Sequence, residues 1–142
     1  MHVSFRHLIA MVLSAAVLPT WAQAPAASAA PDPKLIRLGL ILPLTGGSSD
    51  MGNSARVGAQ VAVDEINAVG GYLGRRLELV IRDDQANNDM GLAHAQDLVL
   101  KEKVAATVGF CNTGVAMKAL DVFQNNQHLL IVPCATGTAI TA

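Results

Sequence analysis

Segments typical of strands alternate with segments typical of helices over most of this chain. Four short apolar runs have the length and composition of strands, at 35–42, 76–82, 104–109 and 129–132. Three amphipathic segments lie between them, at 50–69, 89–101 and 112–125, and residues 139–142 resemble the start of another helix. Alternation of this kind, with right-handed crossovers, predicts an α/β fold: a doubly wound parallel sheet whose strands, numbered along the chain, have the order 2-1-3-4.

The spacing of apolar residues predicts which face of each helix is buried. His94 is expected on the outer face of the second helix, and Asp50 or Asn53 and Asp89 are expected to cap the first and second helices. The predicted inner faces are Ala55, Ala59, Ala62, Ile66 and Val69 in the first helix, Leu92, Ala95, Leu98 and Val99 in the second, and Val115, Ala119, Val122 and Phe123 in the third.

The amino-terminal segment has the features of a secretory signal peptide. A basic start precedes the apolar run 8–18, which Pro19 ends and small residues follow. Cleavage is expected after Ala22 rather than after Ala24, because Pro25 would follow the second cut. The apolar run would rise only ~16 Å as a helix, too short for a permanent membrane span. We expect a signal peptide at 1–22, an Ala/Pro-rich linker at 23–33, a folded region at 34–142 and export to the periplasm, with no integral membrane segment after cleavage.

Composition and missing motifs exclude several classes of function. The net charge is −1 and only 4% of residues are aromatic, so no nucleic-acid partner is expected. Gly46, Gly47 and Gly52 do not form a dinucleotide or phosphate-binding fingerprint, and no G-x-S-x-G elbow or nucleophile–base pair occurs. Asp83 and Asp84 are interpreted as a turn and a solvated cap. We expect no enzyme, no cofactor and no metal.

Parallel sheets of this type bind ligands beyond the carboxyl ends of their strands, at the point where the strand order reverses. This rule selects the loops at 44–51 and 110–114, with 134–138 beside them. Asn112, Thr113 and Gly114 would place a hydroxyl and backbone amides at a helix start, where anions bind. Residues 133–137 offer a second such turn. Thr113 could equally serve as a helix cap alone.

Cys111 and Cys134 follow two strands that the predicted order makes neighbours. Adjacent strands lie ~4.8 Å apart, and a disulfide needs Cα atoms roughly 4.4–6.8 Å apart, so a bridge is geometrically allowed. Cys134 comes one residue after Pro133 and Cys111 comes two after Gly109, which suggests that the side chains point in different directions. We therefore expect free thiols in preference to a bridge.

Several motifs in order resemble the start of the branched-chain amino-acid (Leu/Ile/Val) binding proteins of ABC importers. The motifs stand at 36–39, 42–46, 58–60, 66–71, 74–77, 82–84 and 133–136. The resemblance implies a periplasmic-binding-protein type I fold, in which two lobes close on the ligand. Members are far longer than this chain, so the sequence resembles a truncated first lobe without its partner lobe.

The resemblance also implies roles for particular residues. Thr113 holds the place of the hydroxyl that binds the ligand carboxylate, beside Asn112. The carbonyl of Cys134 and the hydroxyl of Thr136 would hold the ammonium group, with Ala135 between them. Met51 stands where many members bring an aromatic wall. A disulfide that some members carry cannot form, because residues 85–88 contain no cysteine.

The resemblance thus implies a non-enzymatic solute receptor that captures an amino acid or related amide and presents it to the membrane permease of an ABC importer. Three alternatives remain open. One is the ligand-sensing domain of a receptor with the same fold. The others are a small exported α/β enzyme and a non-functional remnant.

Overall fold

The strands form one parallel sheet, with β1 (Leu35–Leu42) near its centre. The computed structural model describes residues 32–141. The predicted signal peptide, its cleavage site and all but the end of the linker lie outside the described residues. β1 pairs with β2 (Arg76–Asp83) on one side and with β3 (Ala106–Gly109) on the other, and β3 pairs with β4 (Leu130–Ile131). The observed order β2-β1-β3-β4 confirms the predicted 2-1-3-4 sheet.

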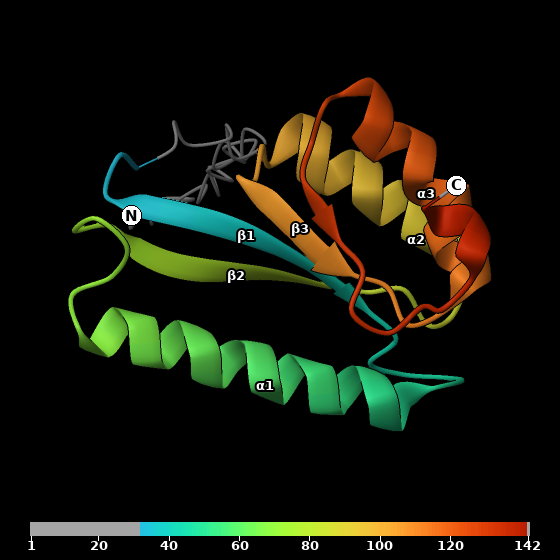
Figure 1. Ribbon diagram of the computed structural model, residues 1–142, viewed down its shortest axis with the longest axis horizontal. Helices are drawn as coiled ribbons and strands as arrows, with labels where there is room; N and C mark the ends of the chain where they lie inside the picture. Colours follow the sequence, from blue (N-terminus) through green and yellow to red (C-terminus); the bar gives the residue numbers. More distant parts are fainter. Residues whose placement is uncertain (1–31, 142) are drawn as a thin grey trace, which may run out of the picture.

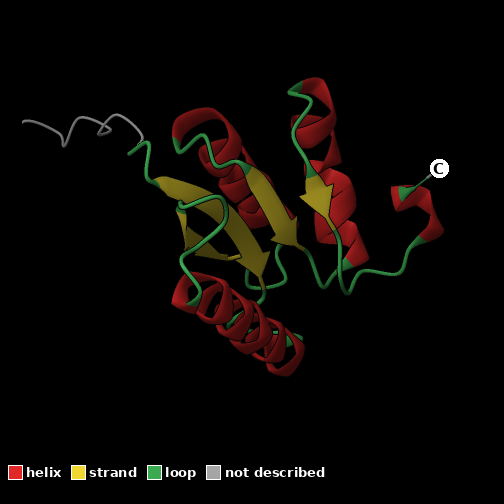
Figure 2. Ribbon diagram, turned by 60° about the vertical axis from the view of Figure 1, so that its left-hand side comes forward, coloured by secondary structure: helices red, strands yellow, loops and turns green. Residues whose placement is uncertain are grey.

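Helices cover both faces of this sheet, as Figures 1 and 2 show. α1 (Ser49–Ala68) lies on one face, and α2 (Asn88–Gln96) and α3 (Thr113–Asn125) pack together on the other. Successive residues of a strand point to opposite faces. Ile41 and Val80 accordingly join the core under α2 and α3, whereas Leu40 and Leu42 join the core under α1.

The buried face of α1 differs from the prediction in its second half. Val63 is buried and Ala55 and Ala59 are partly buried, but Ala62, Ile66 and Val69 are exposed. Asn67 explains the difference, because its side-chain amide donates to the carbonyl of Leu77 at 2.9 Å and accepts from the amide of Leu77 at 2.8 Å. These bonds turn Asn67 toward β2 and rotate Ile66 and Val69 away from the sheet.

The helix starts also differ from the prediction. α1 begins after Ser48, which has a φ of 65° and makes no side-chain cap. The cap of α2 is Asn87 and not Asp89, since the Asn87 side chain accepts from the amides of Asp89 and Met90. α2 continues into a π-helical turn, η1 (Asp97–Lys101), which places Asp97 beside Arg82.

The third helix and the last strands follow the prediction more closely. α3 starts and ends as predicted and buries Val115, Ala119 and Phe123, with Val122 partly buried. β3 and β4 are shorter than the predicted runs at 104–109 and 129–132. A single 3-10 turn, η2 (Thr138–Ile140), stands where a further helix was predicted to begin. Between residues 32 and 141, no helix has both the length and the apolar composition that a membrane span requires.

Candidate functional site

The segments that follow β3 and β4 are joined to each other at the carboxyl end of the sheet (Figure 1). The amide of Ala135 donates to the carbonyl of Phe110 at 3.1 Å. The amide of Gly137 donates to the hydroxyl of Thr113 at 3.2 Å. These bonds bring the start of α3 against the 134–137 segment, as the sequence predicts from the strand order.

Thr113 is the first residue of α3, and its hydroxyl does not cap the helix. Asn112 has the extended backbone of an N-cap residue, but its side chain makes no capping bond, and its carbonyl accepts the amide of Ala116 at 3.0 Å. The amides of the first helical turn, at 113–115, carry the positive end of the helix dipole. With the Thr113 hydroxyl they form a donor group suited to a carboxylate.

Gly137 belongs to the predicted turn at 133–137, but its packing role there was not predicted. A Cβ atom at this position would collide with the side-chain methyl of Thr113. The absence of a side chain therefore allows the 134–137 segment to lie directly on the start of α3. A glycine immediately after Thr136 was the only sequence signal for this close approach.

Asp83 organises the loop that follows β1, a role that the interpretation as a solvated turn missed. Its carboxylate accepts from the amides of Leu44 and Thr45 and, at 2.6 Å, from the hydroxyl of Thr45. The amide of Gln85 donates to the same carboxylate at 3.0 Å. Burial opposes the charged form, but these donors together lower the pKa of Asp83. The charged carboxylate thus ties the loops after β1 and β2 together.

Asp84 is fully buried, which contradicts its interpretation as a solvated residue. One carboxyl oxygen accepts the amide of Ala86 at 2.9 Å, and the other has no hydrogen-bond partner among the described residues. Burial raises the pKa of Asp84, and the nearby Asp83 charge adds to the rise. His94 also departs from its predicted outward position, since it is half-buried and its Nε2 donates to the carbonyl of Asp83 at 3.1 Å.

The two cysteines lie side by side at this end of the sheet. Their Sγ atoms are 2.6 Å apart, and both side chains pack in the cluster formed by Leu40 and Leu42. The prediction that they point in different directions is wrong. Both are free thiols in the structure, Cys111 buried and Cys134 half-buried.

Five of the six predicted ligand residues fall into one region. These are Asn112, Thr113, Cys134, Ala135 and Thr136, and Thr136 is exposed at its surface. Met51 lies instead in the first turn of α1 with half of its side chain exposed, and takes no part in the contacts that join the other five. The adjacent Gly52 fixes that turn against β1, because a Cβ there would collide with the carbonyl oxygen of Pro43.

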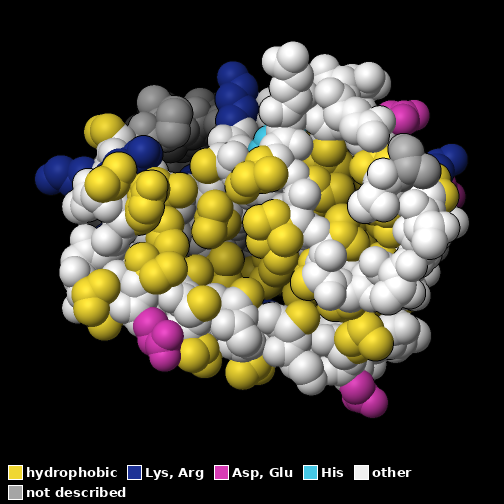
Figure 3. Space-filling model, in the orientation of Figure 1, with side chains coloured by type: hydrophobic (Ala, Val, Ile, Leu, Met, Phe, Trp, Pro, Cys, Tyr) yellow, Lys and Arg dark blue, Asp and Glu magenta, His cyan; other side chains and the backbone are white. Residues whose placement is uncertain are grey.

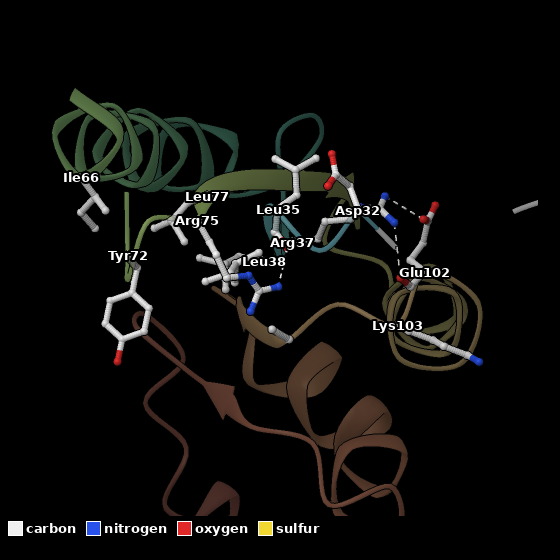
Figure 4. Close-up of a pocket in the computed structure, with 12 residues that line it drawn as sticks. Asp32, Leu35, Arg37, Leu38, Ile66, Tyr72, Arg75, Leu77, Glu102 and Lys103 are labelled. Carbon is white, nitrogen blue, oxygen red and sulfur yellow. Dashed lines mark hydrogen bonds and ion pairs between the residues drawn. The ribbon is translucent and has the colours of Figure 1, made fainter. Parts of the chain in front are cut away.

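A pocket lies at the opposite, amino end of the sheet, where no site residue was predicted (Figure 4). It has a volume of about 480 Å³, and Leu38, Leu77 and Tyr72 contribute to its lining. At its edge the Arg37 guanidinium pairs with the Glu102 carboxylate at 2.8 Å, and Arg75 donates to the carbonyl of Leu35. This ion pair stabilises the connection between β1 and the end of η1.

The remaining titratable side chains of residues 32–141 are dispersed over the structure. The described part of the chain contains no group of three or more metal-ligating side chains. His128 lies 3.0 Å from the hydroxyl of Thr107, but the Thr107 side chain has no exposed surface. Burial lowers the pKa of His128, which keeps the ring neutral near neutral pH.

Comparisons with known proteins agree with this fold. A family model described as "Periplasmic binding protein" matches residues 35–141. The chain is 39% identical to the Leu/Ile/Val-binding protein BraC3 of Rhizobium johnstonii over 106 residues, which are 75% of this chain and 29% of that protein.

Two solved structures extend the likeness to three dimensions. The branched-chain amino-acid transporter substrate-binding protein LivJ of Streptococcus pneumoniae, in complex with isoleucine, superposes with a TM-score of 0.73 at 33% identity. The match covers 76% of this chain and 31% of LivJ. A solute-binding protein of an ABC transporter from Rhodopseudomonas palustris, in complex with 3,4-dihydroxybenzoic acid, superposes with a TM-score of 0.70 at 27% identity. That match covers 76% of this chain and 29% of the Rhodopseudomonas protein.

The chain thus spans about three tenths of the length of the proteins that it matches. The matched region includes the whole sheet and the three segments at its carboxyl end. The four-stranded sheet has the topology of a type I lobe, and the predicted resemblance to Leu/Ile/Val-binding proteins is confirmed. The chain belongs to the periplasmic binding protein family.

Proposed function

We propose that this chain forms the amino-terminal lobe of a solute-binding protein that captures an amino acid for an ABC importer. The observation that carries the proposal is the contact between the start of α3 and the 134–137 segment. It joins Thr113, at the start of α3, to Gly137, the residue that follows Thr136, and so supports a site shared by the two segments. Donors and acceptors for the two charged groups of an amino acid thus lie in one region.

The ligand carboxylate would bind at the start of α3. The Thr113 oxygen already accepts the Gly137 amide, and its hydroxyl proton has no acceptor within residues 32–141, so this proton can be donated to a carboxylate. The amides at 113–115 have no carbonyl partner within the helix and can donate to the same carboxylate. The carbonyl of Cys134 and the hydroxyl of Thr136 would accept hydrogen bonds from the ammonium group, and Asn112 and Ala135 would line the contact.

The names of similar proteins support a branched-chain amino acid as the ligand. BraC3 is named for Leu, Ile and Val, and LivJ was solved with isoleucine. The Rhodopseudomonas protein holds 3,4-dihydroxybenzoic acid, an aromatic acid that shares the carboxylate but lacks the ammonium group. Recognition of the carboxylate at α3 is therefore the part of the proposal common to both ligand classes.

Location and partners follow from the same proposal. The signal peptide at 1–22 would direct the chain to the periplasm, where the loaded protein would meet the membrane permease of the importer. A second lobe would supply the other half of the cleft, so the 142-residue chain should bind far more weakly than a two-lobed protein. No catalytic step is proposed, because the similar proteins are transport receptors and Thr107, the hydroxyl beside His128, is fully buried.

Backbone amide NMR shifts would test the proposal on the chain itself, since NMR detects millimolar binding. Leucine should perturb the amides of Thr113, Gly114 and Gly137. Isovalerate keeps the carboxylate but lacks the ammonium group, and should perturb the amides at the start of α3. Leucinamide lacks the carboxylate and should leave the NMR shifts of those amides unchanged.

Thr113→Val should weaken the leucine response roughly tenfold or more, because a hydrogen bond to a charged group contributes about 1.5–3 kcal/mol. Thr138→Val is the matched control in the adjacent turn, since the hydroxyl of Thr138 makes no hydrogen bond with the described residues. The absence of any shift at α3 with carboxylates at roughly 50 mM, a range in which weak half-site binding is measurable, would contradict the proposal.

A further inference from the structure

The register of β3 and β4 places Cys111 opposite Cys134. Val108 pairs with Ile131. Cys111 comes three residues after Val108, and Cys134 comes three residues after Ile131. The bond from the Ala135 amide to the Phe110 carbonyl shows that the two segments stay together beyond the ends of the strands. Neighbouring parallel strands are ~4.8 Å apart, within the Cα separation that a disulfide accepts.

The side chains meet as this register requires. The two Sγ atoms are 2.6 Å apart, and both side chains contact the same apolar cluster. Cys111 is only 9% exposed, whereas Cys134 is half-buried and can be reached from solvent. The pair therefore combines close approach with one accessible sulfur, which thiol–disulfide exchange needs.

We propose that Cys111 and Cys134 form a disulfide in the exported protein, and that this bond fastens the start of α3 to the 134–137 segment. The proposal rests on the proposed function for its oxidising compartment and for the importance of the two segments. The bond would close a loop that contains all of α3. It would hold Thr113 and Gly137, whose contact otherwise depends on a single hydrogen bond.

The oxidant would be an external disulfide, carried by a small molecule or by an oxidoreductase. The Cys134 thiol loses its proton, attacks that disulfide and releases one thiol of the oxidant. Cys111 then loses its proton and attacks the Cys134 sulfur, which releases the second thiol and leaves the internal bond. Two protein thiols are oxidised, and one external disulfide is reduced to two thiols. Burial and the neighbouring Cys134 raise the pKa of Cys111 to about 12, so Cys134 is the sulfur that starts the exchange.

The direct test counts free thiols. The full chain is expressed with its own amino-terminal segment in a bacterium that exports it, unfolded without reductant, alkylated with N-ethylmaleimide and weighed by mass spectrometry. We expect no label before reduction and two after it. Cys111→Ser and Cys134→Ser should each carry a single sulfur that cannot close the bond. Two labels on the exported wild-type chain before reduction, or a dimer linked between chains on a non-reducing gel, would overturn the proposal.

A second measurement tests the consequence. Reduction of the wild-type chain should lower its thermal unfolding midpoint by on the order of 10 °C, since a cross-link of this loop length restricts the unfolded state. The double variant Cys111→Ser/Cys134→Ser should unfold at one temperature with or without reductant. An unchanged wild-type midpoint would remove the fastening role. The number of free thiols does not depend on a ligand, so the two proposals can fail separately. A bridged chain whose amide NMR shifts do not change with leucine would refute the proposed function alone. A chain with two free thiols whose amide shifts do change would refute the disulfide alone.

Discussion

The two faces of the sheet are packed to different degrees. The face under α2 and α3 has a continuous buried core, in which Phe110 and Phe123 meet edge to face with ring centroids 6.2 Å apart. Under α1, by contrast, the buried cluster consists of Leu40, Leu42 and Cys111, Val63 of α1 is buried as well, and the surrounding apolar residues are partly exposed. Apolar side chains also gather across the middle of the hollowed surface in Figure 3.

Geometry accounts for the difference. A helix is about 10 Å wide and covers roughly two strands that are ~4.8 Å apart. α2 and α3 lie side by side and contact each other as well as the sheet, whereas α1 contacts mainly β2 and β1. On the α1 side Ile131 of β4, which pairs with Val108, is therefore half exposed. The core under α2 and α3 should accordingly contribute more to stability than the core under α1.

Removal of an aromatic ring from the well-packed face should have the largest effect. Phe123 is 2% exposed and contacts Phe110 and His128. Phe123→Ala should reduce the free energy of unfolding by about 3–5 kcal/mol, because it removes a buried ring and leaves a cavity. Urea unfolding followed by circular dichroism would measure the loss. Met117→Ala, on the same helix with 40% exposure, is the control and should change the free energy by less than ~1 kcal/mol. Equal losses in both variants would contradict the comparison.

The second prediction concerns the point where α1 is attached to the sheet. Gly52 is buried against the Pro43 carbonyl, while a Cβ at Gly58 would have no atom within 4 Å. Gly52→Ala should cost about 2–3 kcal/mol, because the backbone that it meets cannot turn aside. Gly58→Ala should raise the free energy of unfolding by about 0.5–1 kcal/mol, since alanine favours a helix interior. Thermal unfolding of the two variants should shift in opposite directions; a shift in the same direction would show that α1 is not held at Gly52.

The sequence was sufficient for the sheet because its signals there are local and repeated. Each strand is a short apolar run bounded by turn residues, and crossover handedness then restricts the order. The burial of α1 was predicted less well because Asn67 binds the backbone of β2, and a polar side chain that faces a sheet does not register in a count of apolar residues.

The candidate site also has a part that could be predicted from the sequence and a part that could not. Thr113 and the 134–137 segment were predicted because strand order alone brings carboxyl ends together. The roles of Asp83, Gly137 and the paired cysteines were missed, because they depend on the register and backbone path of loops. The count that separated Cys111 from Cys134 used Gly109 and Pro133 as strand ends, whereas β4 ends earlier, at Ile131.

A matched pair on α1 tests how much of the thinner core this helix supplies. Val63 is 6% exposed and Val61 is 50% exposed, two residues apart on the same helix. Val63→Ala should cost about 1–2 kcal/mol for the apolar groups removed from the core. Val61→Ala should stay within about 0.5 kcal/mol of the parent protein. Guanidinium unfolding at a fixed pH would measure both, and a greater loss at Val61 would mean that α1 buries a different face.

The smallest expected effect concerns the charged edge of the well-packed face, which is the ion-pair cluster of Arg82, Asp97 and Glu102. Arg82 donates to the Asp97 carboxylate at 2.8 Å and to Glu102 at 3.0 Å, and all three side chains are partly exposed. The hydrogen bond from Arg82 is the main cause of the lowered pKa of Asp97. Because solvent screens such pairs, Asp97→Asn should cost no more than about 1 kcal/mol near pH 7.

The pH dependence of that cost separates charge from packing. The pKa of Asp97 is lower in the folded protein than its ordinary value of 3.8, so the unfolded chain takes up a proton first as the pH falls. The stabilisation is complete above ~pH 5 and is lost as the pH falls through 3.8 and then through the lower folded value. Urea unfolding should therefore show a gap at pH 7 between the unfolding free energies of the parent protein and Asp97→Asn. This gap should narrow below pH 4, and 1 M salt should narrow it at pH 7 as well. Asp121→Asn, exposed on α3, should show no comparable gap at either pH. If the Asp97→Asn gap persisted unchanged at low pH, it would reflect packing of the amide, and the charged edge would contribute nothing to the stability of the α2–α3 face.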